Sequence, residues 1–212
     1  MVYKVDDIMR DVRVCLDQNM TSEQLLQTGD IDTLSLDDIV RSKILEAVVR
    51  VHTVAPTHLL EAGHNFGDAI FWGDLESGWV LLPHDFLRLI VFEMSDWERA
   101  VFNAITPEAP EYALQRQRVK ALRGTAQRPV CVLTTRPEGR ALEFYSCKSE
   151  DAYVRRGQYL PYPVIDDEGG IDISEKCFTA VVYTVAALVL NTYGEADKAS
   201  AMVELAKSIL QQ

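Results

Sequence analysis

Residues 172–206 read DISEKCFTAVVYTVAALVLNTYGEADKASAMVELA, and this stretch decides the fold class. Its first part, residues 175–193, is apolar on nearly every side, which is typical of a helix that is buried all round. We expect Ser174 to cap this helix and Gly194 to end it as a left-handed residue. Residues 199–209 then carry apolar side chains at helical spacing on one face. The stretch therefore predicts an antiparallel helical hairpin.

The N-terminal part of the chain is also helical. Residues 3–18 and 36–53 repeat apolar side chains at helical spacing, and acidic residues in the first turn suit the helix dipole. Ser35 is placed as the N-cap of the second helix, which ends before Pro56. A further short helix is predicted at 22–28. We expect these helices and the C-terminal hairpin to pack as one bundle.

The middle of the chain has the composition of β-strands. Two hairpins are predicted, one from residues 69–72 and 79–82, and one from residues 130–134 and 141–146. Arg136-Pro137-Glu138-Gly139 supplies the turn of the second hairpin, and its proline and glycine make this signal the clearer of the two.

Two more strands complete the β-rich region. Residues 86–94 read FLRLIVFEM, which indicates a central strand buried on both faces, with a short buried helix as the alternative. A last strand is expected at 158–164, where Pro161 and Pro163 limit it to a sheet edge.

Helices, antiparallel strands and a helical hairpin follow one another along the chain, which is an α+β pattern. We expect one domain over residues 1–212, because this length suits a single core. It comprises N-terminal helices at 1–62, a β-rich region at 63–170 and the hairpin at 171–212. Residues 103–128 form a basic helix or extended loop within it, either an arm that lies on a partner or a plain surface loop.

Charge is unevenly distributed along the sequence. The formal net charge is −11, which disfavours a tight grip on phosphate backbones. Residues 114–156 nevertheless hold 10 Lys and Arg against 4 Asp and Glu. This basic stretch is either a solvated face or a surface that pairs with a neighbouring subunit. The candidate interface residues are Arg116, Arg118, Lys120, Arg123 and Arg128.

The sequence carries no recognisable catalytic, cofactor or metal motif. It contains neither a phosphate-binding glycine loop nor a nucleophile elbow, and its four cysteines form no CxxC pair. Its four histidines lack metal-ligand spacing. We therefore predict no cofactor, no metal and no enzymatic activity. We also predict a cytosolic protein with reduced thiols, because no signal peptide is recognisable and the longest apolar run is too short to span a bilayer.

Three groups of side chains still have a chemical alternative. Cys147, His84 and Asp85 could form a nucleophilic set, although buried small hydrophobes are the simpler interpretation of the cysteines. Glu93 and Glu143 lie within apolar strands, where we expect a structural ion pair of one of them with Arg88; a general acid and base is the chemical alternative. The three tryptophans, at positions 72, 79 and 97, either anchor an interface or fill the core, and we expect at least two in the core.

Three stretches resemble the head–tail connector, or adaptor, proteins of tailed bacteriophages, above all those of short-tailed phages. They are GWVLLPHDFLRLIVF (Gly78–Phe92), GQYLPYP (Gly157–Pro163) and the C-terminal stretch quoted above. In that family, helices at both ends flank a β-rich middle and extended loops contact neighbouring subunits. The similarity lies in the order of elements, and the family has no catalytic residues to carry over.

The resemblance implies a structural virion protein in the phage neck, made in the host cytoplasm. Copies would form a homo-oligomeric ring, usually of about twelve subunits, beneath the portal protein. The ring would extend the DNA channel, let DNA pass without sequence-specific binding, and dock a downstream tail or ring protein; no membrane is involved. Leu114–Arg128 would supply part of the subunit interface, so that its deletion blocks assembly and leaves the monomer folded. The alternatives are a cytosolic scaffold or regulatory module and a cysteine-dependent hydrolase.

Overall fold

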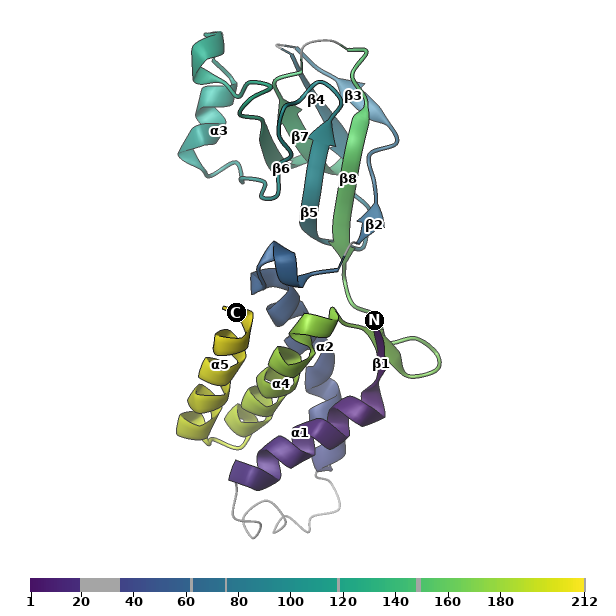
Figure 1. Ribbon diagram of the computed structural model, residues 1–212, viewed down its shortest axis with the longest axis vertical. Coiled ribbons are helices and arrows are strands. Elements are labelled where there is room, and N and C mark those ends of the chain that lie inside the picture. The colour runs from purple at the N-terminus through teal and green to yellow at the C-terminus, as the bar shows by residue number, and fades with distance from the viewer. Residues whose placement is uncertain (20–34, 62, 75, 118, 148–149, 212) are drawn as a thin grey trace. The chain divides into compact units, whose positions relative to one another are not determined.

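The chain forms two compact units (Figure 1). The computed structural model describes residues 1–19, 35–61, 63–74, 76–117, 119–147 and 150–211, and the predicted helix at 22–28 lies outside them. The helical unit comprises Met1–Glu61 and Pro163–Gln212, and the β unit comprises Ala62–Tyr162. The sequence predicted one domain, whereas in the structure the two helical ends of the chain join in one unit and the β-rich middle forms another.

In the described part of the helical unit, four long helices lie where helices were predicted. They are α1 (Val5–Asn19), α2 (Leu36–Val54), α4 (Phe178–Thr192) and α5 (Ala196–Leu210). The almost wholly apolar α4 packs against the other three, which explains why it has no polar face. Together the four helices form the predicted bundle. These helices and the strands described below confirm the predicted α+β class.

The helix ends follow the sequence signals in two of three cases. Ser35 and Asp38 form a reciprocal capping box at the start of α2, and Gly194, with φ of 80°, ends the α4 segment. The prediction that Ser174 caps the long helix is wrong. A 3₁₀ turn, η3 (Glu175–Cys177), precedes α4, and the Ser174 hydroxyl instead accepts a hydrogen bond of 3.2 Å from the backbone N–H of Glu61.

A small ribbon of two antiparallel strands, which the sequence analysis did not predict, completes the helical unit. It pairs β1 (Val2–Lys4) with β9 (Gly170–Asp172). Tyr3 in the ribbon stacks on Phe178 of α4 with 4.3 Å between ring centroids. The single turn η1 (Thr57–Leu59) follows α2. Strands of three residues are too short to show an alternating pattern, so only their packing reveals them.

The β unit contains two antiparallel sheets. One has the strand order β3-β4-β7-β6, and the other has the order β2-β8-β5. The strands are β2 (His64–Asn65), β3 (Ile70–Trp72), β4 (Ser77–Leu81), β5 (Phe86–Met94), β6 (Val130–Arg136), β7 (Gly139–Tyr145) and β8 (Val154–Pro161). Both predicted hairpins are present, as β3–β4 and β6–β7.

Two positions in the second sheet differ from the prediction. β8 is the middle strand and β5 lies at the edge. Pro161 is the last residue of β8 and Pro163 lies beyond it, so neither proline removes a hydrogen bond from the interior of the ladder. β5 is buried by core packing of residues such as Phe86 and Phe92, and not by strands on both sides.

An aromatic cluster forms the core of the β unit. Phe92 lies 5.6 Å from Phe144 and 5.8 Å from Trp97 between ring centroids. Trp72 is half-buried and meets Phe144 edge-on. Two of the three tryptophans thus belong to the core, as expected. The third, Trp79, is partly buried and stacks on Phe71 with 5.7 Å between ring centroids.

Candidate functional site

The basic segment 103–128 is folded onto the β unit. It contains the short helix α3 (Pro110–Gln115) and the 3₁₀ turn η2 (Lys120–Leu122), joined by loops. Ile105 bridges to β6, because its N–H donates to the carbonyl of Cys131 and its carbonyl accepts from the N–H of Leu133, both at 2.9 Å. The segment is therefore a helix within a loop that is anchored to a sheet.

Buried polar contacts hold the segment in shape. The amide oxygen of Gln115 accepts a hydrogen bond of 2.8 Å from the N–H of Gly124, and its amide nitrogen donates to the carbonyl of Glu111. Both Gln115 and Arg123 are buried. Deletion of Leu114–Arg128 would remove these buried groups as well as the surface, so substitutions of single exposed residues are the cleaner test of an interface.

The five candidate interface residues are not equivalent. Arg116 is exposed, and its guanidinium donates to the hydroxyl of Tyr112 at 2.7 Å and stacks on that ring. Arg128 is also exposed, whereas Arg123 is buried. Lys120 begins η2, and Arg118 lies outside the described residues. The structure therefore presents Arg116 and Arg128 at the surface of the segment.

Large apolar side chains are exposed in the same stretch of the sequence as these arginines. Phe102, Leu114, Val119 and Leu122 are 48%, 41%, 57% and 50% exposed. Large apolar groups in contact with water are typical of surfaces that meet a partner when several lie in one region. The charge of this segment is visible in the sequence, whereas its exposed apolar side chains are not, because the periodicity of the segment is weak.

The carboxylates within the strands pair with arginines other than the predicted Arg88. Glu143 on β7 bonds Arg136 on β6, and the Arg136 guanidinium lies 4.5 Å from the centroid of the Trp79 ring. Glu93 on β5 pairs with Arg155 and Arg156 on β8. Strand order is the reason for the difference, because β5 pairs with β8 and shares no sheet with β7.

The structure does not assemble the nucleophilic set of Cys147, His84 and Asp85. His84 and Asp85 precede β5, whereas the Cys147 thiol is hydrogen-bonded to Asp96, which follows the far end of β5. Nine residues of extended chain span about 30 Å. Burial, followed by the charge of Asp96, raises the pKa of the Cys147 thiol to about 12, which keeps it protonated at neutral pH.

The histidines are divided between the two units. His58 lies on η1 in the helical unit, whereas His64 lies on β2 in the β unit. His52 on α2 is buried, and burial lowers its pKa to about 4. Its Nε2 atom accepts a hydrogen bond of 3.5 Å from the N–H of Ser174. Over the residues that the structure describes, no three His, Cys, Asp or Glu side chains gather as metal ligands.

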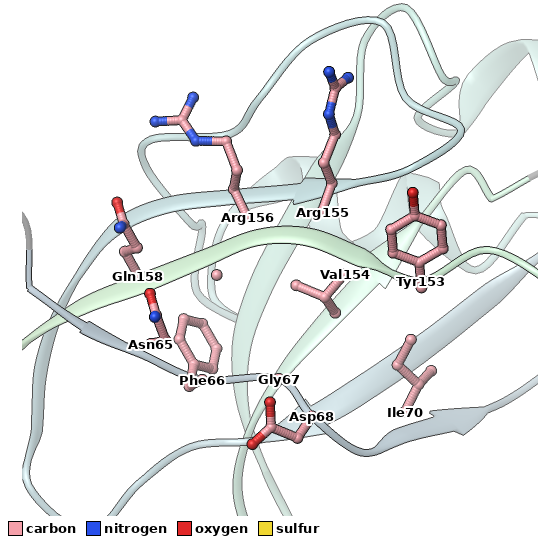
Figure 2. A pocket seen from close by; sticks show the side chains of 11 residues that line it. Asn65, Phe66, Gly67, Asp68, Ile70, Tyr153, Val154, Arg155, Arg156 and Gln158 are labelled. Atoms are coloured by element: carbon pink, nitrogen blue, oxygen red, sulfur yellow. The ribbon is translucent and has the colours of Figure 1, made fainter.

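A pocket of about 440 Å³ opens beside β8 (Figure 2). One wall is the chain from Asn65 to Ile70, and the other is the chain from Tyr153 to Gln158. Arg155 and Arg156 lie in its lining, and Gly67 in the first wall has a φ of 100°. The sequence analysis did not identify this pocket. The only signal was the adjacent arginine pair, which has no special meaning without the strand pairing.

Comparison with known proteins adds no relative. No protein-family model matches this chain, and no curated protein matches its sequence. Among the described helices, none is both long and apolar enough to cross a membrane.

Proposed function

We propose that this chain is a structural assembly protein, the subunit of a head–tail adaptor ring that lies beneath the portal of a tailed phage. The ring extends the DNA channel and docks the next tail component. The observation that carries the proposal is the exposure of Arg116, Arg128 and four large apolar side chains within or next to segment 103–128, namely Phe102, Leu114, Val119 and Leu122. The order of elements, with terminal helices joined in one unit around a β-rich insertion, supports it further.

Energetics favour burial of this surface. Full burial of a leucine or phenylalanine side chain contributes about 1.5–3 kcal/mol, so four half-exposed side chains supply roughly 3–6 kcal/mol at each contact. A closed ring repeats one heterologous contact at every subunit, which multiplies this contribution. The adjacent arginines orient the contact towards acidic surfaces.

The test uses the intact chain and the portal protein encoded in the same genome. The double variant Leu114→Ser and Leu122→Ser should weaken co-sedimentation with the portal at least tenfold, because it removes exposed apolar surface without opening the core. Leu81→Ser is the matched control, since Leu81 is exposed in the same unit but lies outside the segment. Equal co-sedimentation of the double variant and the control would refute the role of the segment.

A further inference from the structure

A β-bulge places two arginines side by side at the pocket of Figure 2. Along the β5–β8 ladder, Glu93 pairs with Arg156 and the next residue, Met94, pairs with Val154. Arg155 is therefore the extra residue of β8, without a partner across the ladder. A bulge of this kind breaks the alternation of side chains and re-aims one of them. Figure 2 shows the guanidinium groups of Arg155 and Arg156 projecting to the same side of β8.

The two guanidinium groups share one carboxylate. Arg155 lies 3.4 Å from one oxygen of Glu93, and Arg156 lies 3.9 Å from the other. The Glu93 side chain is only 13% exposed, whereas those of Arg155 and Arg156 are 61% and 53% exposed. Within this cluster of three side chains, two cations against one carboxylate leave one positive charge, and both arginines are more than half exposed.

The rest of the pocket provides further polar contacts. Asn65 and Gln158 are cross-strand partners, and both carry amides at the pocket. Tyr153 is largely exposed, and Asp68 in the opposite wall offsets part of the positive charge of the two arginines. Arginines bind a carboxylate through paired, charge-assisted hydrogen bonds, and neighbouring amides add donors to such a site.

We propose that Arg155 and Arg156 form a carboxylate-binding site, and that an acidic side chain on the helical unit of a second copy of this chain occupies it. The assignment of a second copy rests on the proposed self-assembly. Charge is its basis. The helical unit contains 9 Lys and Arg and 19 Asp and Glu, a net charge of −10, whereas the β unit contains 12 and 13, a net charge of −1. The helical unit of any second copy therefore carries the excess of negative charge that complements the arginine pair.

The direct test is calorimetric titration of the full chain with a hexaglutamate peptide at low ionic strength. Arg155→Gln with Arg156→Gln should weaken binding at least tenfold, and Arg99→Gln, an exposed arginine outside the pocket, should leave it unchanged. Because the double variant leaves Glu93 without its two cations, a triple variant that adds Glu93→Gln restores neutrality. Tryptophan fluorescence checks that each variant is folded.

Assembly on the portal distinguishes this inference from the proposed function. Loss of hexaglutamate binding and of assembly in the same folded variants supports the site. Unchanged hexaglutamate binding in the double variant overturns it, and so does a DNA oligonucleotide that binds the pair more tightly than hexaglutamate. If the wild type and the double variant assemble equally well, a second copy is not the occupant of the site, but the adaptor function still stands. Wild-type protein that binds hexaglutamate and never assembles refutes the adaptor, and with it the second copy.

Discussion

Acidification should destabilise the helical unit through one histidine. His52 is buried among the helices, and burial lowers its pKa from 6.5 to about 4. Asp172 and Glu61 oppose this shift without cancelling it. Below pH 6.5 the unfolded chain therefore binds a proton at His52 that the folded chain does not bind. The contribution of neutral His52 to the free energy of unfolding is thus complete above pH 6.5 and is lost as the pH falls towards 4.

The size of the effect follows from the two pKa values. The full loss is about 3 kcal/mol, at about 1.4 kcal/mol for each unit of pKa difference, and about 2 kcal/mol of it is lost between pH 7 and pH 5. This upper window is preferable for the measurement. Glu61 also has a lowered pKa, because it accepts a hydrogen bond from the N–H of Glu175, and its contribution is lost only in more acidic solution.

The assay is urea denaturation at pH 7 and pH 5, followed by two signals. Circular dichroism at 222 nm reports mainly on the long helices of the helical unit. Tryptophan fluorescence reports on the β unit, because all three tryptophans lie there. We expect the free energy of unfolding to fall with pH in the first signal, and His52→Gln to remove this dependence. An equal pH dependence in His52→Gln would refute the reasoning, as would a loss below about 0.5 kcal/mol in the wild type.

Two further outcomes follow from local geometry. Gly194→Ala should lower the stability of the helical unit by about 1 kcal/mol in the same circular dichroism assay, because φ of 80° strains a residue with a Cβ atom; an unchanged midpoint would speak against the left-handed helix end. Cys147 should react with iodoacetamide far more slowly than the partly exposed Cys15 in the native chain, measured by peptide mass spectrometry. Similar native rates for the two thiols would contradict the burial of Cys147.

Local signals predicted the elements of this fold well. The Ser35–Asp38 capping box, the apolar stripe of α2 and the turn at Arg136–Gly139 are all encoded within a few residues, and each is present. The α+β class followed from their order. The order of strands within a sheet is not local, and for that reason β5 and β8 exchanged their expected places. Pro161 led to the wrong prediction that β8 is an edge strand, because a proline removes a ladder hydrogen bond inside a strand but not at its end.

The candidate surface was predictable only in part. The positive charge of residues 114–156 was visible in the sequence, and Arg116 and Arg128 are indeed exposed. Nothing local distinguishes Arg123, which is buried within the segment, next to Gly124, whose N–H donates to Gln115. The pairing of Arg155 and Arg156 at one pocket depends on a bulge, which arises from the register of β8 on β5. Register is a tertiary property, and only the structure supplies it.

The central proposal is that the chain assembles as a ring on a portal. The most direct measurement is its mass in solution by light scattering, alone and mixed with the portal protein of the same genome, with negative-stain microscopy of the mixture. The account predicts that subunits join the portal and form a closed ring at its base. A chain that remains monomeric over the whole concentration range and stays apart from the portal would contradict it.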